Sequence, residues 1–174
     1  MKNICEHELI LSIARREVSR DHGRDLDWDY VIAVAYAHGL LPLLHKHVAS
    51  ADLIPGHVLS RLKREAVANS QSILHLVGKQ LRVYKLFQEH HIAVAIFKGP
   101  LLSQMAYGEI SLRQAGDIDV LINRRDFAPA RLLLESLGYE MTPRLTRAQL
   151  SSHLSNHCEI QFMRDEWLTV VDLH

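Results

Sequence analysis

The sequence predicts an α+β fold in which a helical N-terminal subdomain packs on a small mixed sheet. Apolar residues recur at helical spacing up to about residue 90, and short apolar runs bounded by turn residues alternate with helical segments after it. The chain has 174 residues, 48% of them hydrophobic and 23% charged, and we find no internal repeat or low-complexity tract. This length and composition are typical of one folded domain, or of one α/β unit with a helical extension.

Three helices are expected before residue 50. The first is predicted over residues 6–19, where apolar residues recur at near-helical spacing. Asp27 or Asp29 can cap the second helix, and Gly39 ends it. The third helix is short and covers residues 41–49. Together these segments predict a compact helical hairpin.

One long helix is expected over residues 57–90, because apolar residues follow a single helical stripe through this stretch. Pro55 lies near its start, where a proline is well tolerated, and Gly78 is its expected weak point. We place the boundary between a helical subdomain, residues 1–90, and an α/β core, residues 91–174, at the end of this helix.

Strands and helices are predicted to alternate in the core. The apolar run IAVAIF, residues 92–97, predicts a buried strand that runs into a turn. The segments EIQFM and WLTVVDLH near the C-terminus suit a β-hairpin. The elements expected between them are a short helix over 100–107, a strand over 117–123, a helix over 126–137, a brief strand near 139–141 and a short helix over 146–154. This is βαβαβ-like connectivity.

Two aspartates stand two residues apart on the second predicted strand. Because side chains alternate along a strand, Asp117 and Asp119 leave the same face about 6.6 Å apart. Two such carboxylates repel each other unless a cation lies between them, and hard oxygen ligands suit Mg²⁺ or Mn²⁺, which bridge substrate phosphates in nucleotidyl transfer. Asp172 stands on another apolar strand, with His174 on its own side, and can complete a cluster of three carboxylates.

The turn Lys98-Gly99-Pro100 lies between a predicted strand and a predicted helix. Glycine allows close backbone approach, and a helix N-terminus favours an anion such as a triphosphate. Lys98 and Arg113 can add positive charge. Pro100 has no backbone N–H and no hydroxyl, so it offers neither donor to an anion at this turn. Ser103 is the nearby residue whose hydroxyl we consider as a substitute. Because an isolated aspartate pair or Lys-Gly turn is common, the order of the motifs carries more weight than their spacing.

In this order, the segments FKGPLL, AYGEISLRQAGDIDVLI, LLESLGYE and VVDLH resemble the nucleotidyltransferase superfamily of the polymerase β type, and more closely its uncharacterised bacterial branch. The resemblance covers residues 92–174, with a looser match to the helical N-terminal region. It implies that Asp117 and Asp119 bind the metal and that Asp172 is a third acid, which also helps to deprotonate the attacking hydroxyl. It further implies contacts with the nucleotide phosphates from Lys98, Gly99, Ser103 and Arg113.

The activity implied by this resemblance is Mg²⁺- or Mn²⁺-dependent transfer of a nucleoside monophosphate from an NTP to an acceptor hydroxyl of a small molecule or a protein. Relatives generally continue beyond the third acid with further helices, so a fragment or a minimal form is expected here. Two alternatives stay open. One is an inactive binding or regulatory module of the same fold, and the other is a helical interaction protein in which the aspartate pair is incidental.

Composition argues against several other classes. The 20 Lys and Arg residues balance the 20 Asp and Glu residues, so no global positive field is available to hold an extended nucleic acid. The apolar runs are far shorter than the ~20 residues needed to cross a bilayer, and the N-terminus lacks a signal-peptide pattern. Cys5 and Cys158 form no CxxC pair. We therefore expect a cytoplasmic protein with no membrane span.

Histidines offer a second metal hypothesis. The chain has 12 histidines, and His153 and His157 approach an i, i+4 zinc pair with Cys158 beside them. No further ligand is visible in the sequence, so a loop leading into a strand is the simpler interpretation. A Cys158 nucleophile with His157 as its base is disfavoured, because adjacent side chains on a strand point apart.

Overall fold

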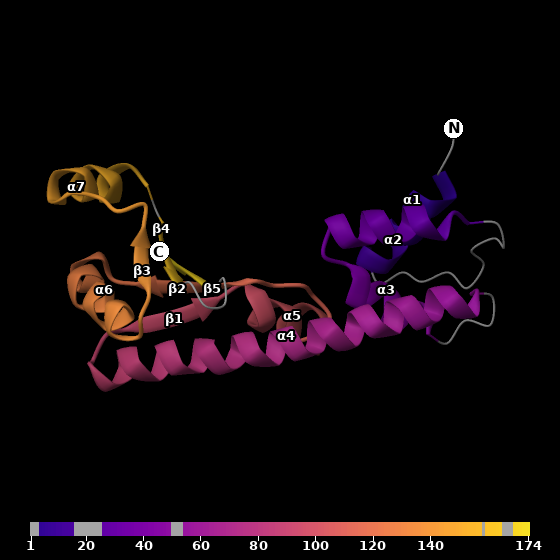
Figure 1. Ribbon diagram of the computed structural model, residues 1–174, viewed down its shortest axis with the longest axis horizontal. Helices are drawn as coiled ribbons and strands as arrows, with labels where there is room; N and C mark the ends of the chain where they lie inside the picture. Colours follow the sequence, from indigo (N-terminus) through magenta and orange to yellow (C-terminus); the bar gives the residue numbers. More distant parts are fainter. Residues whose placement is uncertain (1–3, 16–25, 50–53, 158, 165–168) are drawn as a thin grey trace. The chain divides into compact units, whose positions relative to one another are not determined.

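The computed structural model describes residues 4–15, 26–49, 54–157, 159–164 and 169–174. Its fold is α+β, as predicted, with helices leading in the N-terminal part and a five-stranded mixed sheet in the C-terminal part (Figure 1). No helix in these ranges is both long and apolar enough to cross a membrane. Contacts divide the chain into two compact units, the first made of Met1–Ile73 and Ser103–Ala115, the second of Leu74–Leu102 and Gly116–His174. The expected boundary at residue 90 stays a prediction.

Three short helices and the start of a long one build the first unit. They are α1 (Ile4–Arg15), α2 (Trp28–Ala37), α3 (Leu41–Val48) and α4 (Gly56–Glu89), which continues into the second unit. The end predicted for the first helix, at residue 19, lies outside the described residues. The core of this unit consists of aliphatic side chains, among them Leu9, Ile13, Val31, Ile32, Leu41, Leu44, Val58 and Leu62.

Local signals set the ends of α2. Asp27 is its N-cap, and the carboxylate accepts a hydrogen bond from the backbone N–H of Tyr30 at 3.1 Å. This confirms one of the two predicted caps. Gly39 follows the helix with a φ of 67°, a left-handed conformation that glycine adopts without strain.

The second unit is built on the sheet. Its strands are β1 (Val94–Phe97), β2 (Asp117–Ile122), β3 (Glu140–Thr142), β4 (Ile160–Arg164) and β5 (Thr169–Leu173), in the order β1-β2-β5-β4-β3. Strands β2 and β5 pair in parallel, and the other neighbours pair antiparallel. The antiparallel pairing of β4 with β5 agrees with the predicted hairpin, whose connecting residues 165–168 lie outside the described residues.

The helices of the second unit follow the predicted alternation. They are the C-terminal part of α4, the start of α5 (Gly99–Tyr107), α6 (Phe127–Ser136) after a 3-10 turn (Arg124–Asp126), and α7 (Arg147–Asn156). Thr146 and Gln149 form a capping box at the start of α7, each side chain accepting a hydrogen bond from the backbone N–H of the other.

One face of the sheet is the core of the second unit. Phe162 on β4 is fully buried, and its ring centroid lies 6.5 Å from that of Phe127 on α6. Lys79 on α4 donates a hydrogen bond to Thr169 on β5, on the same face. Helices α4 and α6 therefore cover this face, whose buried side chains include Ile118, Val120, Phe162, Val171 and, from the helices, Val83, Phe87 and Leu134.

Candidate active site

The opposite face of the sheet brings three carboxylates together. Asp119 on β2 is in register with Asp172 on the parallel strand β5, and Asp117 precedes Asp119 by two residues on the same face. Neighbouring strands lie about 4.8 Å apart. The predicted position of Asp172, on the strand next to the aspartate pair, is confirmed. We call Asp117, Asp119 and Asp172 the acid face.

Two donors meet Asp119, which is only 3% exposed. The Lys98 ammonium donates a hydrogen bond to its Oδ1 at 2.6 Å, and Nε2 of His174 lies 3.2 Å from the same oxygen. A buried carboxylate is costly unless it is paired, and these two contacts provide that pairing. Both contacts are made to Oδ1, so Oδ2 is the oxygen of Asp119 that they leave for a further ligand.

Lys98 reaches Asp119 from an uncommon backbone conformation. It follows β1 directly with a φ of 58°, and Gly99, with a φ of 44°, begins α5. Left-handed conformations of residues other than glycine are rare and gather at functional sites. The hydrogen bond to Asp119 raises the pKa of Lys98, helped by the charges of Asp119, Glu159 and Asp117 and opposed by partial desolvation, so its side chain stays cationic.

Asp172 is satisfied less completely than Asp119. The residue is 6% exposed, and its Oδ1 is buried without a hydrogen-bond partner among the described residues. Burial raises the pKa of its carboxyl, the negative charges of Glu159, Asp117 and Asp119 add to this, and a hydrogen bond with Gln161 acts in the opposite direction. A buried carboxylate oxygen without a partner, beside other acids, is a place where a cation would be stabilised.

His174 and Glu159 were not predicted as site residues. The backbone N–H of His174 donates to Val120 at 2.8 Å, which extends the β2–β5 pairing, and its ring packs edge-on against Phe97 with centroids 5.0 Å apart. Its Nε2 also lies 3.8 Å from Oε2 of Glu159. The position of His174, two residues after Asp172, was a usable signal. No local signal marks Glu159, because it comes near the acids through the β4–β5 register.

Ser103 and Arg113 belong to the first unit, whereas the acid face belongs to the second. Ser103 is fully buried, and its hydroxyl donates a hydrogen bond to the carbonyl oxygen of Glu109 at 2.7 Å. Arg113 is exposed. Their contacts with nucleotide phosphates stay predictions.

Two groups of side chains are candidates for a metal site, the acid face and the histidine pair. Within the described residues, no group of three or more His, Cys, Asp or Glu side chains is arranged to hold a metal ion as it stands. In the zinc hypothesis, the rings of His153 and His157 stack 4.3 Å apart, and Cys158 lies outside the described residues. The acid face fits Mg²⁺ or Mn²⁺ by its chemistry, because it offers three carboxylates, and one of their buried oxygens has no partner in the part of the chain that the structure describes.

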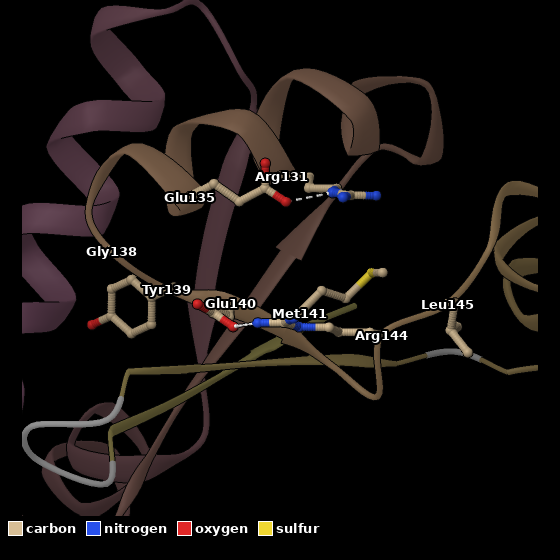
Figure 2. A pocket seen from close by; sticks show the side chains of 8 residues that line it. All are labelled: Arg131, Glu135, Gly138, Tyr139, Glu140, Met141, Arg144 and Leu145. Atoms are coloured by element: carbon tan, nitrogen blue, oxygen red, sulfur yellow. Dashed lines mark hydrogen bonds and ion pairs between the residues drawn. The ribbon is translucent and has the colours of Figure 1, made fainter.

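Among the cavities on the described part of the second unit, two are large enough to hold a small molecule. One, of about 470 Å³, lies between α6 and β3 and is lined by the ion pairs of Arg131 with Glu135 and of Arg144 with Glu140 (Figure 2). The other, of about 450 Å³, is lined by residues that include Gln161, the register partner of Asp172 on β4. The second cavity is therefore the one of this pair that adjoins the acid face.

Comparisons with known proteins give one match. Residues 24–174 match the model of a protein family described as an uncharacterised nucleotidyltransferase. No curated protein matches the chain, and no solved structure matches it. The matched segment contains the whole acid face together with Lys98 and Gly99.

Proposed function

The chain belongs to the uncharacterised nucleotidyltransferase family, whose description implies nucleotidyl transfer with an NTP as substrate, and from this membership we propose a specific reaction. The acid face transfers a nucleoside monophosphate from an NTP to an acceptor hydroxyl, with Mg²⁺ or Mn²⁺ as cofactor. The observation that carries the proposal is the parallel register of Asp119 with Asp172, which places the third acid beside the aspartate pair. We also propose a cytoplasmic location.

Each residue of the acid face has a role in this reaction. Asp117, Asp119 and Asp172 would hold the metal, which when bound supplies neutralisation of phosphate charge. Lys98 and the N-terminus of α5 at Gly99 hold the triphosphate, because a cation and a helix N-terminus both favour an anion. Their contribution to catalysis is positioning and charge stabilisation.

The bond changes are those of an in-line displacement. The acceptor oxygen bonds to the α-phosphorus, and the bond from the α-phosphorus to the bridging oxygen breaks. Pyrophosphate leaves with that electron pair, and the hydroxyl proton passes to the carboxylate of Asp172. A base in this position makes the acceptor oxygen a better nucleophile.

A nucleotide-binding module without turnover is the second candidate. Pro100 favours it, because the second residue of α5 has no backbone N–H to offer the phosphates. Such a module would bind an NTP through Lys98 and Gly99 and transfer nothing. It differs from the enzyme in turnover, not in nucleotide binding.

Incubation with α-labelled NTPs, Mg²⁺ or Mn²⁺ and cell extract tests the proposal. We expect a labelled acceptor with the wild-type protein and none with Asp117→Asn, which removes a metal ligand from an exposed position at little cost in stability. Melting curves with NTP and Mg²⁺ provide a separate measure of binding, since a ligand at a hundredfold excess over Kd adds ~2.7 kcal/mol to the free energy of unfolding. Binding without labelling would favour the module, and the absence of both would reject nucleotide chemistry.

A further inference from the structure

Different strands flank the acid face on its two sides. The strand order places the Lys98-Gly99 turn, at the end of β1, on one side of Asp119 and Asp172, and places β4 and β3 on the other. In an in-line displacement the attacking oxygen and the leaving oxygen lie on opposite sides of the phosphorus. Since the proposed function places the triphosphate at the turn, the acceptor has to approach from β4 and β3.

The cavity of about 450 Å³ lies on that side. Gln161, which lines it, is the β4 register partner of Asp172. Glu159, which also lines it, lies 3.8 Å from Nε2 of His174, and the same nitrogen contacts Asp119. The cavity and the acid face are thus joined through side chains of the second unit. The cavity volume is within the range of pockets that bind small molecules, roughly 300–1,000 Å³.

The lining of this cavity indicates the chemistry of its ligand. Thr142 and Gln161 offer hydrogen bonds, and the rings of His153 and His157, stacked with an interplanar angle of 22°, offer a flat surface. Among the described residues that line it there is no Lys or Arg, and Glu159 contributes a carboxylate. A phosphate or carboxylate group would find no strong cationic partner here. Hydroxyl groups on a ring, in contrast, would find hydrogen-bond partners in Thr142 and Gln161.

We propose that this cavity binds the acceptor, and that the acceptor is a small hydroxylated ring compound without an acidic group. The proposal deepens the proposed function and rests on it. The acceptor ring lies against the histidine pair, and its hydroxyl passes Gln161 to reach Asp172. The oxygen then bonds to the α-phosphorus, pyrophosphate leaves, and the proton passes to Asp172.

Separated acceptor pools test this assignment. A small-molecule filtrate of cell extract is divided on an anion exchanger into a flow-through of neutral and cationic compounds and an eluate of anionic ones, and the protein fraction is kept as a third pool. Each pool is incubated with wild-type protein, α-labelled NTPs and Mg²⁺. We expect labelled product in the flow-through pool. Label that appears only with the anionic pool or the protein fraction would overturn the proposal.

Two tryptophan variants test the place of binding. Thr142→Trp fills the cavity, and Leu132→Trp adds the same side chain at an exposed position of α6 outside it. We expect Thr142→Trp to reduce labelling of the flow-through pool about tenfold or more, a size typical of altered pocket contacts, and Leu132→Trp to leave it unchanged. The NTP-induced rise in melting temperature should stay the same in both variants. Equal labelling by the two variants would overturn the proposal.

His157→Ala is the second cavity variant, because it replaces an exposed side chain and keeps the test valid if Thr142→Trp unfolds. We expect it to weaken labelling of the flow-through pool and to leave the NTP-induced melting shift in place. Wild-type protein that shows this shift but labels only another pool contradicts the acceptor proposal alone. Wild-type protein that shows neither the shift nor any label contradicts the proposed function, and the acceptor proposal with it.

Discussion

The two units treat buried carboxylates in different ways. In the described part of the first unit, Glu6 is 7% exposed, and its Oε1 accepts a hydrogen bond from the backbone N–H of Asp27 at 3.1 Å. In the second unit, Oδ1 of Asp119 contacts the side chains of Lys98 and His174. Oδ1 of Asp172 has no hydrogen-bond partner among the described residues. A backbone N–H at the start of α2 bonds to the first carboxylate. Side chains contact Asp119, and one oxygen of Asp172 has no partner among the described residues.

We interpret this difference as one between a structural carboxylate and carboxylates that we propose to be functional. A buried acid that serves only the fold is expected to be fully hydrogen-bonded, because an unmade bond costs free energy of unfolding. Natural proteins depart from this rule mostly at functional sites. Glu6 joins α1 to the start of α2, while we propose that the acid face keeps unpaired oxygens for a ligand. Substitutions at four residues test this contrast.

The largest expected effect is on turnover in Asp119→Asn. The substitution removes the charge that faces Lys98 and His174, so we expect nucleotide transfer to fall by roughly 10²–10³ and the NTP-induced melting shift to disappear. The labelled-product assay and melting curves with NTP and Mg²⁺ measure this. Glu6→Gln is the matched control and should keep both properties. Full transfer activity in Asp119→Asn would mean that the acid face does no chemistry.

Asp172 should separate turnover from binding. We expect Asp172→Ala to reduce labelled-product formation by about 10², the range for loss of a general base, and to change NTP affinity by no more than about twofold. Equal losses of both would mean that Asp172 acts as a ground-state metal ligand and not as the base. In the absence of metal, Asp172→Asn should raise the melting temperature, since it removes a buried charge beside other acids. A lower melting temperature would contradict this account of its burial.

Lys98→Gln should change two affinities in opposite directions. The ammonium lies on Asp119 Oδ1, so its removal should strengthen Mn²⁺ binding without nucleotide and weaken NTP binding with metal, each by about tenfold, a size usual for coupled binding. Titration followed by electron paramagnetic resonance and by melting curves would measure the two affinities. Lys85→Gln, at an exposed position of α4, is the control. Weaker binding of both ligands would show that Lys98 helps rather than opposes the metal.

The smallest effect is expected in the first unit. Glu6→Ala leaves the N–H of Asp27 without its acceptor, which should lower the free energy of unfolding by about 1–3 kcal/mol. Chemical denaturation measures this loss, and Glu8→Ala, at an exposed position of the same helix, should cost little. A change in NTP affinity in Glu6→Ala would contradict the purely structural role of this carboxylate.

Several features were predictable because their causes are local. Helical periodicity predicted α1 to α4, and Asp27 caps α2 as one of two candidates. The alternation of apolar runs and turns predicted the sheet region, and the spacing of Asp117 and Asp119 placed both on one face of a strand. The resemblance of the motif order to a nucleotidyltransferase family then agreed with the family match over residues 24–174.

Long-range pairing decided the rest. The sequence by itself determined which residues form strands and which acids they carry, because alternation along a strand depends only on neighbouring residues. Only the tertiary structure decided that β2 and β5 pair in parallel with Asp119 beside Asp172, and that Lys98, His174 and Glu159 gather around them. Strand order and register depend on contacts between segments far apart in the chain, and a shift of one residue would turn every side chain to the opposite face.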